Sequence, residues 1–178
     1  MQIIVYWGLG HRNGHGRAHG GVDVEGEDLA ERLGRRGLSL AQTLAVAERV
    51  ARALSALHER DIVHANLAPQ QIFLVDRQLS HIKLTDFGAA RRLGAAVPSV
   101  TRTTPEYMAP ECVAGLEPPS PQGDIYTLGC VLFECLTGRP PYLGSTLVEL
   151  FSEVVNARPR ASTRSSSGLT AMPTTWSS

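Results

Sequence analysis

The sequence predicts one α+β domain that is mainly helical and contains a few short β-strands. Three observations support this: a long amphipathic helix begins at residue 40, short β-branched runs follow it, and a strongly apolar helix begins at residue 124. The 178 residues are 43% hydrophobic, with 17 basic and 17 acidic residues. This composition is that of an ordinary globular protein, and its balanced charge does not predict nucleic acid or an anionic membrane as a partner.

Residues 1–22 begin with a strand-like apolar run and then become rich in glycine and histidine, so a short strand and a loop are expected. His11, His15 and His19 recur every fourth residue, and on a helix they would form a zinc or nickel site. The glycines between them argue against that helix and favour a solvated loop. The apolar run is too short to span a membrane and lacks the features of a secretory signal, which favours a cytoplasmic protein.

The helix expected from Leu40 to about Arg60 has Ser39 as a candidate N-cap. Its apolar residues recur at intervals of three and four: Leu40, Leu44, Ala47, Val50, Ala51, Leu54 and Leu57. Three short strands should follow, at 62–63, 72–75 and 81–84, with polar turns between them.

Asp124 is a candidate N-cap for a second helix through Thr137, which has almost no polar face and should therefore be central. Gly138 and two prolines end it, and a third helix is plausible from 145 to 156. The Ser/Thr-rich residues 158–178 should be a disordered tail, with a phosphoacceptor segment as the alternative. Three cysteines without metal-ligand spacing predict buried thiols.

Three short motifs occur in register: His64-Ala65-Asn66-Leu67-Ala68-Pro69-Gln70-Gln71, then Asp86-Phe87-Gly88, then Thr104-Pro105-Glu106-Tyr107-Met108-Ala109-Pro110-Glu111. Together they resemble the catalytic loop, the metal-binding motif and the activation segment of a bacterial-type serine/threonine protein kinase. The resemblance covers about residues 24–142. It implies the mainly helical large lobe of a protein-kinase-like fold at 23–157, with short β hairpins and with the small lobe largely absent.

The resemblance assigns a role to several retained residues. Asp86 would bind the magnesium ion that bridges the ATP phosphates, Asp124 would brace the catalytic loop, and Asp28 would contact the ribose. The remaining matches, which the resemblance makes structural, are His64, Phe87, Gly88, Thr104 and Glu111.

Other positions depart from the family pattern. Asn66 stands at the catalytic base, where an amide cannot accept the substrate proton, and a base typically contributes ~10²- to 10⁴-fold in rate. Ala68 stands at the phosphate-binding lysine, and Gln71 at the asparagine that binds the second metal. Ala65 replaces the arginine that would pair with a phosphorylated activation loop.

Lys83 is the single lysine beside sixteen arginines, and it lies too close to Asp86 to be the small-lobe lysine. Glu111 lacks the usual arginine partner, for which Arg139, Arg158 and Arg160 are candidates. We therefore expect a catalytically impaired, truncated kinase-like module whose protein partners or substrate are unknown, with weak or absent binding of Mg and ATP. Exposed apolar surface near the central helix favours self-association. The alternative is an active kinase that transfers the γ-phosphate of ATP to protein Ser or Thr.

Overall fold

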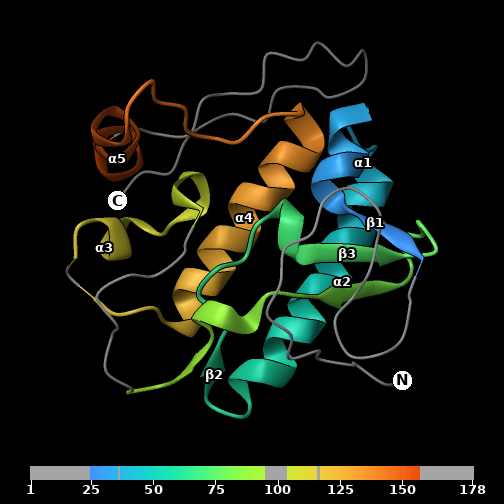
Figure 1. Cartoon of the computed structure of the whole chain (residues 1–178), viewed down its shortest axis with the longest axis horizontal. Coiled ribbons are helices and arrows are strands. Elements are labelled where there is room, and N and C mark those ends of the chain that lie inside the picture. Colours follow the sequence, from blue (N-terminus) through green and yellow to red (C-terminus); the bar gives the residue numbers. More distant parts are fainter. Residues whose placement is uncertain (1–24, 36, 95–103, 116, 157–178) are drawn as a thin grey trace, which may run out of the picture.

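The computed structural model describes residues 25–35, 37–94, 104–115 and 117–156 (Figure 1). The strand and loop expected within residues 1–22, the histidine series and the tail at 158–178 lie outside these residues. Within them the chain is mainly helical, with short antiparallel strands packed against the helices. The α+β prediction is therefore confirmed.

A three-stranded antiparallel sheet in the order β1-β3-β4 is formed by β1 (Gly26–Asp28), β3 (Ile72–Val75) and β4 (Ile82–Leu84). The two strands predicted at 72–75 and 81–84 are confirmed, whereas β1 was not foreseen. β1 can approach β3 closely because residue 26 is glycine: a Cβ there would lie 2.3 Å from the Leu74 carbonyl oxygen.

A short helix, α1 (Leu29–Arg35), follows β1 and was also not foreseen. Its start is capped by Asp28, whose Oδ1 accepts a hydrogen bond of 2.8 Å from the Glu31 N–H. The buried carboxylate of Glu27 pairs with Arg32 at 2.5 Å and with Arg35 at 2.6 Å. This ion-pair cluster fixes α1 against the sheet, where only two leucines of α1 are buried.

Helix α2 (Leu40–His58) confirms the first predicted helix, and Ser39 caps it in a reciprocal capping box with Gln42. The predicted buried face is only partly right, because Leu40, Leu44 and Ala51 are exposed. The residues that α2 buries are Thr43, Val46, Val50, Ala53, Leu54 and Leu57. Arg49 attaches α2 to the β3–β4 turn, since its Nε donates to the Ser80 carbonyl there at 2.7 Å.

Helix α4 (Pro121–Thr137) begins three residues before the predicted start. Its N-cap is Ser120, whose Oγ accepts from the Gly123 N–H at 3.1 Å, so the prediction that Asp124 caps this helix is wrong. The carboxylate of Asp124 instead points out of the first turn to other partners. α4 packs against α2, and Gly138 ends it with a φ of 79°, a left-handed conformation that favours glycine.

The remaining elements surround this helix pair. β2 (Ile62–Val63), which confirms the predicted strand there, pairs with β5 (Arg91–Arg92), and α3 (Pro110–Val113) and α5 (Leu147–Asn156) pack against each other. α5 confirms the helix predicted from 145 to 156, although it begins two residues later.

Cys130 and Cys135 are buried as expected, but Cys112 is only half-buried. Among the described residues no helix is long and apolar enough to cross a membrane.

Candidate active site

Asp124 fixes the backbone of the loop that follows β2. Its two carboxylate oxygens accept hydrogen bonds of 2.9 Å from the N–H groups of His64 and Ala65, and Oδ2 lies 2.8 Å from His58 Nε2 of α2. Ala65 has a φ of 62°, a left-handed conformation that is unfavourable for a residue with a Cβ. The buried carboxylate therefore stabilises a strained turn and joins it to both long helices.

His64 is fully buried and packs against Phe87 with ring centroids 4.9 Å apart. Its Nδ1 accepts a weak hydrogen bond from the Asn66 N–H at 3.4 Å. Burial lowers the pKa of the imidazole, although the carboxylates of Asp124 and Asp86 oppose this shift. A neutral ring that packs on Phe87 is therefore the stable form.

Asp86 lies beside the loop in a left-handed conformation, with a φ of 56°. Its Oδ1 accepts from the Gly88 N–H, and its Oδ2 accepts from Asn66 Nδ2, both at 3.4 Å. The two residues that the sequence placed at the metal and at the catalytic base are thus brought together.

Asn66 also contacts the activation segment, because its Oδ1 accepts from the Thr104 N–H at 3.3 Å. Only one orientation of the amide serves both contacts, since Asp86 needs a donor and the Thr104 N–H needs an acceptor. Asn66 is almost fully buried. Its neutral side chain therefore bridges the metal-binding motif and the activation segment.

Ala68 and Gln71 lie further along the same loop, at the start and end of the 3₁₀ turn Pro69–Gln71. Ala68 has a neutral side chain, so this position presents no cation. Its methyl group is fully buried in the core. The Gln71 carbonyl accepts from the Thr85 N–H at 2.9 Å and so fixes the strand end before Asp86. Within the described residues, the buried Gln71 Oε1 has no hydrogen-bond partner.

A carboxylate and an open amide oxygen are the hard donors that magnesium prefers, so Asp86 and Gln71 fit a metal in chemical type. The fit is incomplete, because the Asn66 amide already donates to one oxygen of Asp86. No group of three or more His, Cys, Asp or Glu side chains among the described residues could hold a metal ion.

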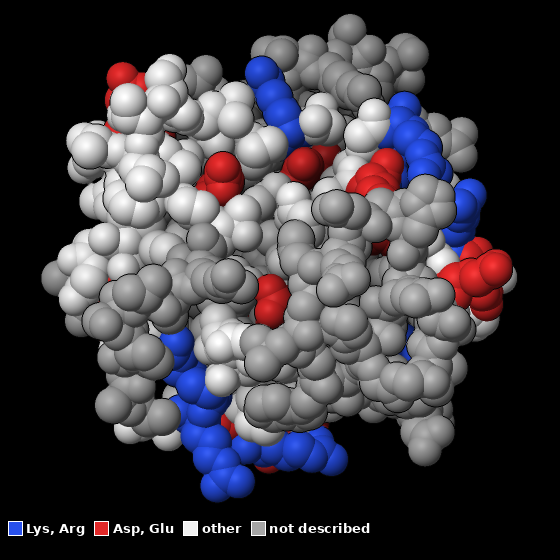
Figure 2. Space-filling view, viewed as in Figure 1, with Lys and Arg blue, Asp and Glu red and all other residues white. Residues whose placement is uncertain are grey.

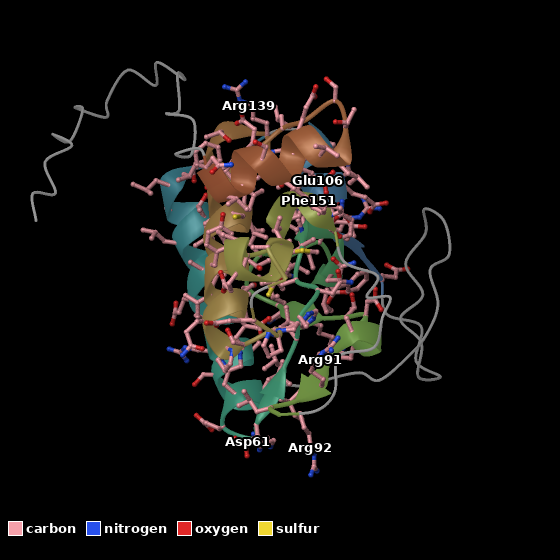
Figure 3. All side chains as sticks on the ribbon, turned by 90° about the vertical axis from the view of Figure 1, so that its left-hand side faces the viewer. Asp61, Arg91, Arg92, Glu106, Arg139 and Phe151 are labelled. Atoms are coloured by element: carbon pink, nitrogen blue, oxygen red, sulfur yellow. The ribbon has the colours of Figure 1, made fainter. Side chains whose placement is uncertain are left out.

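The activation segment is attached to α4 through Tyr107 in the 3₁₀ turn Pro105–Tyr107. The Tyr107 hydroxyl donates to Glu134, and its carbonyl accepts from Thr127 Oγ1 at 2.9 Å. Burial raises the pKa of both the tyrosine and the Glu134 carboxyl. Figure 3 shows the neighbouring Glu106 beside Phe151 of α5.

Glu111 is half-buried at the start of α3, and none of the ion pairs among the described residues involves it. Arg139, one of the three candidate partners, is exposed and does not pair with it. The other two candidates, Arg158 and Arg160, lie outside the described residues.

Arg91 is a site residue that sequence reasoning missed. It lies on β5 opposite Val63, directly before the catalytic loop, and its Nε donates to the Ala89 carbonyl at 3.3 Å (Figure 3). Its Nη1 is buried without a partner among the described residues. The available signal was the arginine pair that follows the Asp86 motif, and β5 pairs Arg91 with Val63, two residues before Ala65.

Two other features lie away from the loop. Asp28 caps α1, and its contact with a ribose stays a prediction.

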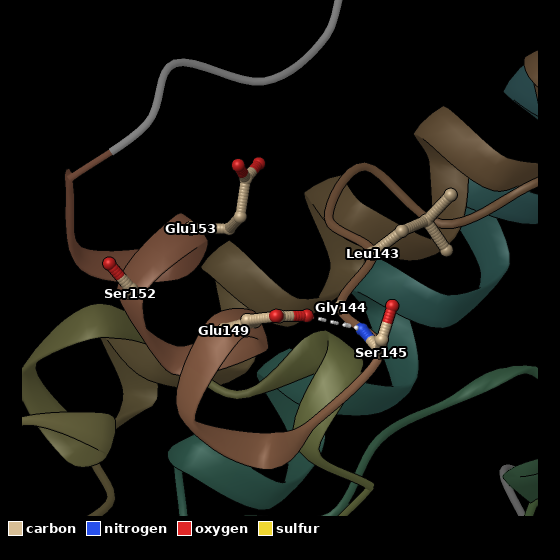
Figure 4. Close-up of a pocket in the computed structure, with 6 residues that line it drawn as sticks. All are labelled: Leu143, Gly144, Ser145, Glu149, Ser152 and Glu153. Atoms are coloured by element: carbon tan, nitrogen blue, oxygen red, sulfur yellow. Dashed lines mark hydrogen bonds between the residues drawn. The ribbon is translucent and has the colours of Figure 1, made fainter.

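A surface pocket of about 540 Å³ lies beside α5 and is lined by Leu143, Gly144, Ser145, Glu149, Ser152 and Glu153 (Figure 4). Glu149 accepts from the Ser145 N–H there at 2.9 Å, so this carboxylate orders the start of α5.

Charge is mixed over the described part of the face seen in Figure 2, where acidic and basic side chains are interspersed. This distribution agrees with the equal totals of acidic and basic residues in the sequence.

The sequence also matches known proteins. A protein kinase domain model matches residues 23–173. The serine/threonine-protein kinase PkaA of Streptomyces coelicolor is 36% identical over 144 residues, which are 77% of this chain and 26% of PkaA. PknA of Corynebacterium glutamicum is 38% identical over 143 residues, 76% of this chain and 29% of PknA. RUNKEL of Arabidopsis thaliana is 40% identical over 105 residues, 57% of this chain and 8% of RUNKEL.

This chain thus spans less than a third of the length of these relatives. The family model nevertheless covers most of the chain, and the matched region includes the loop at 64–71, Asp86, Thr104 and Asp124. The chain therefore belongs to the protein kinase family.

Proposed function

We propose that this chain is a serine/threonine protein kinase-like domain that is impaired in phosphoryl transfer and acts as a binding or regulatory module. The observation that supports this most directly is the amide of Asn66. It lies at the base position, donates to Asp86 and accepts from Thr104. An amide has no lone pair basic enough to take a proton from a substrate hydroxyl.

Other replaced residues near Asn66 also remove groups that phosphoryl transfer needs. Phosphoryl transfer depends on cations that neutralise the charge developing on the phosphate, and Ala68 supplies none. Lys83 is the single lysine of the chain and lies on β4, in register with Phe73. Both the base and the phosphate-binding cation are thus replaced by neutral side chains.

Protein kinases use ATP with magnesium. In this chain Asp86 and Gln71 would hold the metal, which supplies positive charge to the phosphates when it is bound. We propose that this binding is weak, because magnesium would have to displace the Asn66 amide from Asp86 Oδ2.

A second candidate is an active serine/threonine kinase. It is favoured by the Gln71 Oε1 atom, which has no hydrogen-bond partner among the described residues. It is also favoured by the hydrogen bonds that Asp124 accepts from the loop backbone. These features preserve the shape of a catalytic loop, so the two candidates differ in chemistry rather than in fold.

Transfer of labelled phosphate from ATP to a generic protein substrate separates the two candidates. With magnesium present, we expect the wild-type chain to give no more label than an Asp86→Ala variant, which removes the retained metal ligand. Incorporation that is several-fold above the Asp86→Ala background would overturn the proposal.

The Asn66→Asp variant tests whether the missing base is the main defect. We expect no gain in transfer, because the cation at position 68 is still absent. We also expect a lower thermal midpoint, since the new carboxylate would lie beside Asp86 without the amide donor. Restored transfer in Asn66→Asp would show that the rest of the site is competent.

A further inference from the structure

We draw no further inference here: the strongest candidate, the surface pocket beside α5 with the carboxylates of Glu149 and Glu153 in its lining, has Glu149 already bonded to the Ser145 N–H, and nothing in the described part of the structure shows what covers or fills it.

Discussion

Asn66 has two partners that require opposite ends of its amide, a carboxylate and an N–H group. An aspartate in the same place could accept from the Thr104 N–H but would repel Asp86. The neutral asparagine therefore suits a position between a carboxylate acceptor and an N–H donor. This explains how one residue can weaken the chemistry of the site and still stabilise its structure.

His64 shows how burial determines a protonation state. The unfolded chain exposes this imidazole with a pKa near its ordinary value, whereas burial lowers the pKa in the fold. The unfolded state thus binds more protons below about pH 6.5, and the stability that comes from the neutral ring falls as the pH falls through that value.

We predict that the free energy of unfolding of the wild type drops by up to about 1.4 kcal/mol between pH 7.5 and pH 5.5 from this residue. Urea titrations at both pH values measure it. His64→Phe keeps an aromatic ring against Phe87 and should lose this part of the drop, whereas His81→Gln, at an exposed position, should keep it.

Other titratable groups also contribute to the pH dependence of the free energy of unfolding. Burial raises the pKa of the Asp28 and Glu134 carboxyls, so their contributions change in the opposite direction as the pH falls. They are present in all three chains, and so the difference between wild type and His64→Phe isolates the imidazole. An identical pH dependence in those two chains would show that His64 does not titrate on unfolding.

At the scale of elements, Asp124 joins α2, the catalytic loop and α4. Each helix has its own cap, and among the described residues it is the Asp124 carboxylate that binds the loop backbone to both helices. The carboxylate is buried, so its hydrogen-bond partners would be left without an acceptor if it were removed.

We predict that Asp124→Ala lowers the free energy of unfolding by about 3 to 5 kcal/mol, since the buried His64 N–H, the partly buried Ala65 N–H and His58 lose their acceptor. Chemical denaturation at pH 7.5 measures the change. Asp61→Asn is the control, because Asp61 is exposed and asparagine tolerates its positive φ; it should change stability by less than about 0.5 kcal/mol. Similar losses in the two variants would contradict the role given to Asp124.

At the scale of the whole molecule, the large-lobe elements surround the α2–α4 pair, and the candidate active site lies on one side of it.

We predict that 1 mM ATP with 10 mM magnesium raises the thermal midpoint of the chain by less than about 1 °C, because a ligand stabilises a protein only when its concentration exceeds its dissociation constant. Differential scanning fluorimetry measures the shift, with Asp86→Ala as the control. A shift of several degrees in the wild type that Asp86→Ala abolishes would show that the metal and the nucleotide bind well.

Local patterns in the sequence were enough for the elements whose signal is local. The period of α2, its cap at Ser39, the strands at 62–63 and 72–75, and the end of α4 at Gly138 follow from spacing and capping chemistry. β1 and α1 were not predicted because they are short. They depend on the pairing with β3 and on the Glu27 ion pairs, which join residues that no local pattern relates.

The sequence by itself determined the family and the chemical identities at the site, since Asn66, Ala68 and Gln71 are visible without coordinates. Only the tertiary structure decided which groups meet. It removed the helix-capping role from Asp124 and supplied the hydrogen bonds of the bracing role that the resemblance had implied, gave Asn66 its two partners and left part of the apolar pattern of α2 exposed. The physical reason is that periodicity fixes which residues share a helix face, whereas contacts between distant segments fix where that face points.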